Sequence, residues 1–391
     1  MSPSTPRDDA AAFSAYSDAF SEARGYLNFA SYGPPSSRVT EHVAHLLQLA
    51  ADGGNGAVDV LGHEEVRARE ALARLVGFPL QQVGLTGSTS LGLFQVAFGL
   101  PRGTVLVSAG EFPSNLYPWL RTEELGRARI GLIGGPGTQV TPDVVARGVA
   151  KDAGNTGDAG DADDIVAVSV SAVDFRTGYR ADLAGIREAI GPDRLLLVDG
   201  IQALGVADMD WSHADVVIGG AQKWIRGSWG VAGLAMSERA LERIDPVLMG
   251  WTGVARARTY DGEEHSPLPG AAGFSIANLS PYSTGAFAEA LELIDSVGVA
   301  AIDGIVATHA AALIEALDVV GISVLSPRDR ADRAGIVVAG LPGRAVEAHA
   351  ALAGAGITAT VHGEDRIRLS VHATTRSEVF EEAATVLARF R

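Results

Sequence analysis

An aspartate and a lysine lie 24 residues apart in the stretch 195–229. The apolar run 195–198 has the composition of a buried strand, and it ends on Asp199. A second apolar run, 215–220, leads to Lys223. Because α/β folds place their chemistry at the carboxyl ends of the strands, Asp199 and Lys223 are predicted to lie close together there.

An acid and a lysine at neighbouring strand ends are the two protein groups that pyridoxal phosphate (PLP) requires. The lysine forms a Schiff base with the aldehyde of PLP, and the acid keeps the pyridine nitrogen protonated, so that the ring accepts electrons from a substrate carbanion. The spacing alone leaves an ordinary alternative open. Lysines mostly lie on solvated surfaces, and an aspartate after a strand is often a helix cap or a turn residue.

A turn near residue 87 has the residues of a phosphate site. The predicted strand 83–86 is followed by Gly87, Ser88, Thr89 and Ser90, and then by an apolar helical run. A glycine permits a tight turn, and free N–H groups at a helix start, together with two or three hydroxyls, bind a phosphate dianion. Serine and threonine are also ordinary helix caps, so a simple capping turn is the alternative.

Predicted strands alternate with helical segments through the first two thirds of the chain, with strands at 105–108, 130–133 and 165–170. This alternation predicts an α/β fold, in which a mostly parallel sheet lies between helices as a three-layer αβα large domain. The residues that could bind a cofactor or take part in catalysis then fall at or just after strand ends on one edge of that sheet: Ser88, Phe112, Asp174, Asp199 and Lys223. This convergence favours the cofactor site over the ordinary alternatives.

The pattern changes past residue 254. The segment 255–279 is rich in glycine, proline and polar residues, and the predicted helices and strands of a smaller α+β domain follow it. We predict an N-terminal segment, 1–35, that packs near the small domain and the active site. A large PLP-binding domain, 36–254, and a small C-terminal domain, 255–391, are predicted to follow.

Composition excludes several classes of partner and site. The net charge is −16 and no Lys/Arg-rich run is present, so neither nucleic acid nor an anionic membrane is an expected partner. No apolar run has the roughly 18 residues of a membrane span, and the first 13 residues do not resemble a secretory signal, so a cytoplasmic location is expected. The absence of cysteine excludes disulfides, thiolate metal sites and a catalytic thiol, and we predict no metal site. The Gly/Ala/Asp-rich stretch 151–164 is predicted to be an exposed loop.

Several motifs occur in order along the chain: Glu-Phe-Pro-Ser-Asn around Phe112, Asp-Gly-Ile-Gln from Asp199, and Gly-Ala-Gln-Lys-Trp around Lys223. Together they resemble the class V aminotransferase family of PLP enzymes, which includes cysteine desulfurases, kynureninases, isopenicillin N epimerase-like proteins and several carbon–sulfur lyases. The resemblance runs from residues 26–30 to residues 368–370. It implies a PLP-dependent enzyme with the type I fold of PLP-dependent transferases.

The resemblance implies a role for each matching residue. Lys223 resembles the Schiff-base lysine, and Asp199 resembles the acid that pairs with the pyridine nitrogen. Cofactor contacts are implied for Ser88, Thr89, Phe112, Asp174, Gln202, Gln222, Trp251 and Ser280.

The implied contacts differ in kind. Gln202 matches the residue that touches the ring hydroxyl, Ser88 and Thr89 match the phosphate loop, and Gln222 stands where relatives often have a phosphate-binding histidine. Ser280 falls where relatives have a threonine that reaches the phosphate of the neighbouring subunit. The resemblance therefore implies a homodimer with shared active sites.

Three of these residues resemble the kynureninase-like members of the family. Phe112 matches the aromatic residue that stacks on the PLP ring, where desulfurases use a histidine; a flat apolar side chain fixes the cofactor plane without competing for its protons. The loop 173–178, which contains Asp174, and the pair Gly250-Trp251 are similar to the same members. A buried core phenylalanine is the alternative at Phe112.

The resemblance places the substrate at Arg368 and Asn28. Arg368 matches the arginine that holds the substrate α-carboxylate, for which a planar bidentate donor is suited. An exposed strand arginine is the alternative. The chain departs from the family just beyond, with His-Ala-Thr-Thr at 372–375 where relatives often have Tyr-Asn, and we expect His372 to be structural.

The expected reaction begins with removal of the substrate α-proton by Lys223. Aminotransfer is the leading prediction, because returning that proton through Lys223 requires no further catalytic group. Elimination of a β substituent by a carbon–sulfur lyase or a kynureninase-like enzyme is the alternative, and a noncatalytic PLP-fold binding module is a third. Cysteine desulfuration through a persulfide on the enzyme is excluded, because the chain has no cysteine.

Overall fold

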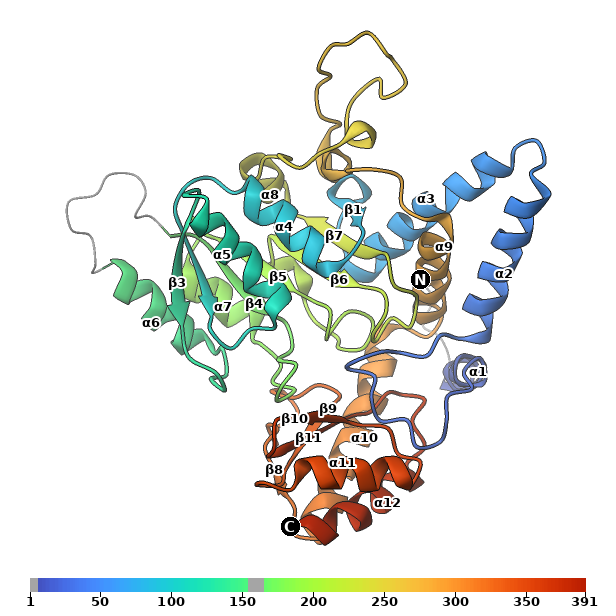
Figure 1. The fold of residues 1–391 in the computed structure, drawn as a ribbon, viewed down its shortest axis with the longest axis vertical. Helices are drawn as coiled ribbons and strands as arrows, with labels where there is room; N and C mark the ends of the chain where they lie inside the picture. Colours follow the sequence, from blue (N-terminus) through green and yellow to red (C-terminus); the bar gives the residue numbers. More distant parts are fainter. Residues whose placement is uncertain (1–5, 154–164) are drawn as a thin grey trace.

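The computed structural model describes residues 6–153 and 165–391 (Figure 1). A seven-stranded sheet with helices on both sides forms the larger body, and a four-stranded sheet with its own helices forms the smaller one. The chain between the first two helices, residues 19–36, runs between these bodies, and we call it the strap.

The large sheet has the order β1-β7-β6-β5-β4-β2-β3. Its strands are β1 Val83–Thr86, β2 Thr104–Ser108, β3 Arg129–Ile133, β4 Ile165–Ser171, β5 Leu195–Asp199, β6 Val216–Gly220 and β7 Ala232–Met236. The five strands from β6 to β3 are parallel, whereas β7 is antiparallel to both neighbours. The carboxyl ends of β2, β4, β5 and β6 therefore meet at one edge.

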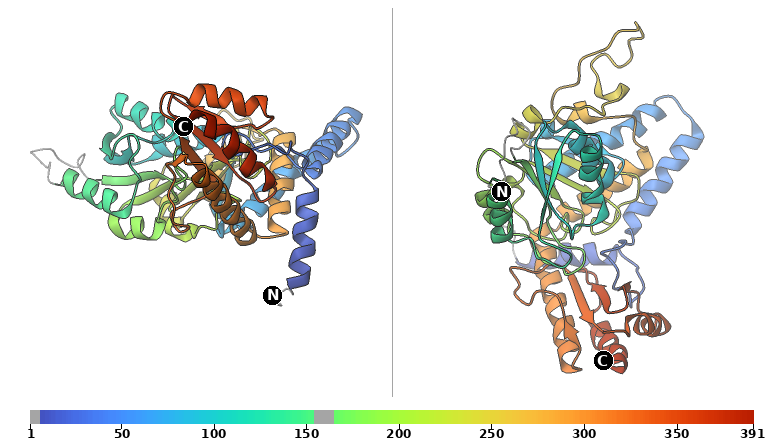
Figure 2. Two further views of the ribbon diagram at one scale, coloured as in Figure 1. Left: turned by 90° about the horizontal axis from the view of Figure 1, so that it is seen from below. Right: turned by 60° about the vertical axis from the view of Figure 1, so that its left-hand side comes forward.

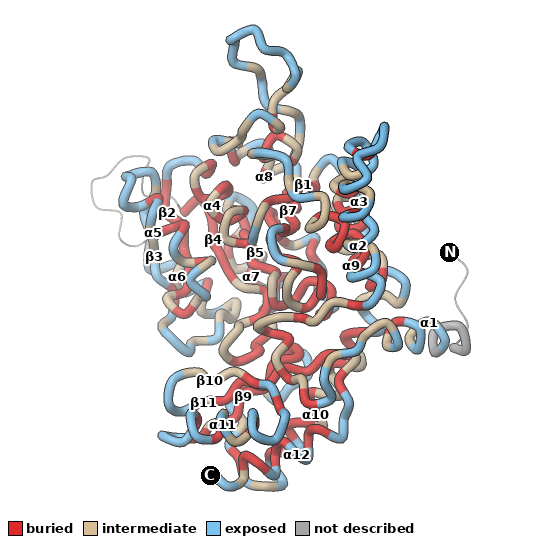
Figure 3. The backbone as a smooth tube through the Cα atoms, turned by 45° about the vertical axis from the view of Figure 1, so that its right-hand side comes forward, coloured by how far each residue is buried: buried red, intermediate tan, exposed pale blue. Residues whose placement is uncertain are grey.

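Helices cover both faces of this sheet. They are α2 Ser37–Asp52, α3 Ala57–Val76, α4 Thr89–Gly99, α5 Tyr117–Glu124, α6 Pro142–Ala153, α7 Leu183–Ile190, α8 Glu238–Arg243 and α9 Pro281–Asp295. Alternate residues of β5 belong to different hydrophobic clusters: Leu196 and Val198 pack in one, Leu195 and Leu197 in the other. This alternation explains why the strand is a continuous apolar run, because both of its faces are buried (Figure 3).

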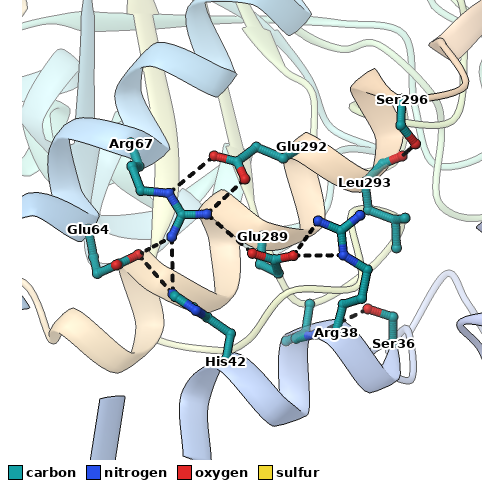
Figure 4. Close-up of polar contacts among 10 residues, drawn as sticks. Ser36, Arg38, His42, Glu64, Arg67, Glu289, Glu292, Leu293 and Ser296 are labelled. Atoms are coloured by element: carbon teal, nitrogen blue, oxygen red, sulfur yellow. Dashed lines mark hydrogen bonds and ion pairs between the residues drawn. The ribbon is translucent and has the colours of Figure 1, made fainter. Parts of the chain in front are cut away.

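Helices α2, α3 and α9 are joined by a network of ion pairs centred on Arg67 (Figure 4). Arg67 contacts Glu64 at 2.8 Å, Glu292 at 2.7 Å and Glu289 at 3.2 Å. Glu289 also pairs with Arg38. Every charged group in this network has a partner of opposite charge within the protein.

The smaller body contains a fully antiparallel sheet of order β10-β11-β9-β8. Its elements are α10 Val299–Val319, β8 Ser323–Val324, β9 Ile336–Gly340, α11 Ala345–Gly354, β10 Thr360–His362, β11 Arg366–Ser370 and α12 Glu378–Leu387. By length and composition alone, α10 is apolar enough to cross a membrane. Its residues Ile302, Val306, Ala310, Leu313 and Leu317 are buried at helical spacing, so we interpret it as a core helix of this body.

The strap connects the two bodies. Its Tyr26 and Asn28 form isolated parallel bridges with Thr358 and Ser370 of the small body. Before the strap, α1 Pro6–Asp18 projects from the rest of the molecule (Figure 2).

The expected α/β class, with a mostly parallel sheet and a smaller C-terminal domain, is confirmed. Strand β7 was not predicted. Of the predicted loop 151–164, residues 151–153 belong to α6 and the rest lie outside the described residues. The division into 1–35, 36–254 and 255–391 stays a prediction.

Candidate active site

Asp199 and Lys223 are positioned by two adjacent parallel strands, β5 and β6. Asp199 is the last residue of β5 and pairs in register with Ile218 of β6, which ends at Gly220, three residues before the lysine. The Asp199 carboxylate is 2% exposed, and its Oδ1 accepts a hydrogen bond from Ile201 N at 3.0 Å. Burial raises the pKa of Asp199 to about 6, against the opposing effect of Lys223.

The Lys223 ammonium is largely enclosed but has no ion pair with any described residue. Burial lowers the pKa of Lys223 to about 8, Asp199 opposes this shift, and Arg368 adds to it. Its Nζ lies 5.4 Å from the centroid of the Phe112 ring. A lysine with this pKa has an appreciable fraction of free amine near neutral pH, which is the form that attacks a carbonyl.

Phe112 follows β2 and precedes a short 3-10 helix, Pro113–Asn115. The ring is 40% exposed, so the alternative of a buried core residue is wrong. Its edge-to-face partner is Phe175, at a centroid distance of 5.1 Å. An open aromatic face beside Lys223 is what a stacked cofactor ring requires.

The turn between β1 and α4 contains two hydroxyls that differ in their hydrogen bonding. Ser88 caps α4 by accepting a hydrogen bond from Leu91 N at 3.1 Å. Thr89 Oγ1 is buried and has no hydrogen-bond partner among the described residues. A Cβ added at Gly220 would lie 2.4 Å from Gln222 Oε1 and 3.1 Å from Thr89 Oγ1, so both side chains face the space above the end of β6. The predicted phosphate residues are thus brought together.

Gln202 and Asp174 already have partners within the protein. Gln202 is buried, its Nε2 donates to Ala30 O at 3.0 Å, and its Oε1 accepts from Trp224 Nε1 at 2.7 Å. The Asp174 carboxylate accepts from Arg176 N at 2.7 Å and from Thr177 within its own turn. Their cofactor contacts stay predictions, because each side chain retains hydrogen-bonding capacity beyond these partners.

Arg368 lies on β11 and is 5% exposed, so the alternative of an exposed strand arginine is wrong. Its Nη1 donates to Phe175 O at 3.0 Å and its Nη2 to Ser31 Oγ at 2.6 Å, but its Nε is buried without a partner. Among the described residues no carboxylate forms an ion pair with it. Burial lowers the pKa of Arg368 to about 10. A guanidinium in this state is suited to a carboxylate supplied by a ligand.

Asn28 belongs to the same hydrogen-bonded group. Thr360 Oγ1 donates to Asn28 Oδ1 at 2.6 Å and lies 3.0 Å from Ser31 Oγ. The predicted substrate residues Asn28 and Arg368 are therefore brought together through Ser31 and Thr360.

Trp251 and Ser280 are placed differently. Trp251 begins a 3-10 helix, Trp251–Gly253, and is 52% exposed. Ser280 is exposed at the start of α9. Neither side chain forms a hydrogen bond, ion pair or ring contact with another predicted site residue of its own chain, within the ranges that the structure covers.

Sequence reasoning assigned no role to Glu111, Ser31, Thr360 or Arg226. Glu111 immediately precedes Phe112, and its Oε1 accepts from Ser171 N at 3.0 Å. Burial raises the pKa of Glu111 to about 7, and Asp199 contributes to the rise. The position of Glu111, three residues after the end of β2 and next to Phe112, was the signal that could have found it.

Comparison with known proteins decides the family. The family model described as aminotransferase class V matches residues 60–365, which is more than half of the chain. This chain belongs to the class V aminotransferase family. Membership confirms the expected cofactor, PLP, and the expected resemblance.

Curated relatives in this class V family include kynureninases. One from Deinococcus radiodurans is 28% identical over 272 residues, which are 66% of this chain and 60% of that protein. Another, from Eremothecium gossypii, is 28% identical over 246 residues, 58% of this chain and 53% of that protein. A serine–glyoxylate aminotransferase from Hyphomicrobium methylovorum is 35% identical over 85 residues, 20% of this chain and 21% of that protein. The kynureninase matches thus span little more than half the length of those relatives.

Solved structures share the fold at low sequence identity. An apo cysteine desulfurase from Thermococcus onnurineus NA1 has a TM-score of 0.80 and 19% identity, covering 93% of this chain and 94% of that chain. The cystine C-S lyase C-DES, in complex with its product cysteine persulfide, has a TM-score of 0.82 and 20% identity, covering 94% and 98%. A C-DES mutant carries glycine covalently linked to PLP.

The described residues of this class V protein fit PLP. The unpartnered Thr89 hydroxyl and the start of α4 suit a phosphate, the open face of Phe112 suits a ring, and the unpaired Lys223 amine suits an aldehyde. The buried Asp199 carboxyl completes the set of groups that a pyridine ring requires.

Proposed function

We propose that this protein is a PLP-dependent aminotransferase that acts on an α-amino acid through Lys223. The observation that carries the proposal is that an amine after β6 of the large sheet and a guanidinium on β11 of the small sheet lie near each other and lack anionic partners among the described residues. Lys223 has no ion pair, and the buried Arg368 has an unused Nε, in the part of the chain that the structure describes. Charges left in this state point to a charged ligand that binds between them.

Each proposed cofactor residue would hold a different part of PLP. Thr89, Ser88 and Gln222 would bind the phosphate, and Phe112 would cover the ring. Asp199 would hold a proton at the pyridine nitrogen, and Lys223 would bind the aldehyde. When bound, PLP supplies an electron-accepting ring and a carbonyl that takes up the substrate amine.

The substrate carboxylate is proposed to bind Arg368. Its Nε has no partner among the described residues, while Ser31, Thr360 and the Phe175 carbonyl fix the plane of the guanidinium. A carboxylate held there would orient the α-carbon toward Lys223. Positioning of this kind accounts for a large part of enzymatic rate enhancement.

Lys223 Nζ is proposed to remove the α-proton and to hold it. If Lys223 delivers that proton to the cofactor and not back to the substrate carbon, the substrate would leave as a keto acid whose oxygen comes from water, its amine would stay with the cofactor, and no further catalytic group would be needed. If a β substituent leaves first, the enzyme is a lyase. The kynureninase relatives favour this second candidate, because they provide the longest sequence matches reported above.

One experiment distinguishes aminotransfer from β-elimination. The PLP-loaded protein is incubated with single amino acids in the absence of a keto-acid acceptor. Transfer predicts one equivalent of keto acid per site with accumulation of pyridoxamine phosphate. Continuous release of ammonia or of a β-cleavage product would reject transfer as the main activity. Lys223→Ala is the control that should abolish either outcome.

We also infer that the active form is a homodimer in which Ser280 serves the partner's site. The exposed positions of Ser280 and Trp251, away from the other site residues of their own chain, support this arrangement. Mixing the inactive variants Lys223→Ala and Ser280→Asp tests it. Hybrid dimers would contain one intact site, so activity should return on mixing. No recovery in verified hybrids would place Ser280 outside the partner's site.

A further inference from the structure

Arg226 lies three residues after Lys223 in an unusual conformation. Its φ is +62°, in the left-handed region that non-glycine residues adopt at a cost. The residue is 1% exposed. A buried charged side chain on a left-handed backbone requires compensating contacts, and its partners show what it holds.

The Arg226 guanidinium joins segments that are far apart in the sequence. Its Nε donates to Pro34 O at 2.6 Å and its Nη2 pairs with Glu22 at 2.6 Å, both on the strap. Its Nη1 donates to Thr374 Oγ1 at 2.8 Å, in the loop after β11. The guanidinium also lies 3.6 Å above the ring of Phe20. Arg226 therefore fastens the strap to the small body from the Lys223 side.

The turn formed by residues 222–226, which contains Lys223 and Arg226, is in direct contact with the strap. Arg226 N donates to Lys223 O at 3.0 Å, and Gly33 N donates to Gln222 O at 2.9 Å. A Cβ added at Gly33 would lie 2.0 Å from Lys223 O, so only glycine permits this approach. Two positions earlier on the strap, Ser31 accepts the hydrogen bond from Arg368. The strap thus touches the backbone of Lys223 and the side chain of Arg368.

We propose that Arg226 is a positioning residue that sets Lys223 and Arg368 relative to each other through the strap. It holds the Lys223 turn, the strap and the loop after β11 in one arrangement. The inference rests on the roles proposed above for Lys223 and Arg368. Loss of the guanidinium should loosen the strap and move both functional groups out of register.

The backbone conformation allows a clean variant. Arg226→Gly removes the guanidinium while accepting φ +62° without strain, whereas Arg226→Ala adds strain to the same loss. Arg24→Ala is the matched control, because Arg24 ties the same strap to Glu382 of α12 at 2.6 Å. That pair is about half exposed and does not touch the Lys223 turn. Glu22→Gln is a milder variant that keeps a hydrogen-bonding oxygen and removes the charge.

Three readouts are needed. Amide hydrogen exchange over 22–34 in the protein without PLP reports the strap itself. The absorbance pH titration of the PLP-loaded protein reports the surroundings of Lys223, and kcat and KM report the proposed reaction. We expect Arg226→Gly to speed strap exchange, lower kcat and raise KM by roughly tenfold each, since charged hydrogen bonds are lost, and to shift the titration midpoint. Arg24→Ala should stay within about twofold of the wild type on all of them.

The proposal is overturned if folded Arg226→Gly keeps the wild-type strap exchange, titration midpoint and KM. It is also overturned if Arg24→Ala gives equal changes, since any strap contact would then suffice. If Arg226→Gly does not fold, Glu22→Gln decides: a smaller change in the same direction supports the proposal, and no change overturns it. Failure of the wild type to bind PLP through Lys223 would refute the proposed function, while strap exchange would still test the role of Arg226.

Discussion

Arg67 and Arg368 are both arginines with little solvent exposure, yet their surroundings are opposite. Arg67 contacts three glutamates from α3 and α9, in a network whose charges are all paired (Figure 4). Arg368 has three neutral oxygen partners, on Phe175, Ser31 and Thr360, with an unused Nε and no carboxylate within the described residues. Removing a charge from water without a counter-charge costs several kcal/mol. From this comparison we infer that the first cluster stabilises the helices, and we propose that a ligand completes the second.

The largest expected effect is on the paired cluster. Arg67→Ala should lower the free energy of unfolding by about 3–5 kcal/mol, because it leaves the buried Glu64 without its arginine and removes one of the two arginines that pair with Glu289. Denaturant unfolding of the protein without PLP measures this. The control Arg38→Ala removes a side chain that is 46% exposed, and it should cost less than about 1 kcal/mol. Equal effects of the two variants would contradict a special role for Arg67.

Removing the guanidinium of Arg368 should affect substrate binding instead of stability. Arg368→Met should raise the KM for the amino acid roughly 100-fold, since charged hydrogen bonds contribute about 1.5–3 kcal/mol. It should leave the free energy of unfolding unchanged or higher, because the removed charge has no counter-charge. Steady-state kinetics and denaturant unfolding check the two parts. Arg366→Met, two residues earlier on β11, is the control, and a similar rise in its KM would count against a specific carboxylate contact.

The buried carboxyls of the candidate site should also make the stability of the protein without PLP depend on pH. Burial raises the pKa of Asp199 to about 6 and that of Glu111 to about 7. A raised carboxyl pKa contributes stability that is fully present below the unfolded pKa near 4 and is lost as pH rises through the folded pKa. Stability should therefore fall between about pH 4 and pH 7, by on the order of 2–3 kcal/mol for Asp199.

Asp199→Asn isolates this effect. The difference in unfolding free energy between Asp199→Asn and the wild type should grow in favour of the variant as pH rises through this window. Parallel curves for the two proteins would show that Asp199 carries no such penalty.

The smallest expected effect is at two neighbouring hydroxyls, of which one has a hydrogen-bond partner and the other has none among the described residues. Ser88 caps α4, so Ser88→Ala should lower the free energy of unfolding by about 1 kcal/mol. Thr89 Oγ1 has no partner, so Thr89→Val should leave stability unchanged or higher while weakening PLP binding about fivefold to tenfold. Unfolding without PLP and a PLP titration measure the two quantities. A stability loss in Thr89→Val larger than in Ser88→Ala would contradict the assignment of Ser88 to helix capping and of Thr89 to PLP binding.

Much of this arrangement is visible in the sequence because strand ends are easy to recognise. The apolar run before Asp199 and the one before Lys223 predicted both strands, and their parallel pairing followed from the alternation with helices. Strand β7 was missed because Ala232–Met236 consists largely of small residues and lacks both β-branched residues and alternation.

The surroundings of Arg368 and Lys223 could not be predicted. Ser31 is separated from Arg368 by most of the chain, and the folded strap brings it there, whereas Thr360 lies opposite Arg368 through the pairing of β10 with β11. Arg226 has no sequence signal, because a left-handed arginine is adopted only when tertiary contacts compensate for it.

Borohydride reduction of the PLP-loaded protein, followed by peptide mapping, tests the central claim most directly. Reduction fixes PLP to the amine that holds it. The account predicts a single labelled peptide containing Lys223, with no label in Lys223→Ala. A label on another residue, or a protein that takes up no PLP, would contradict it.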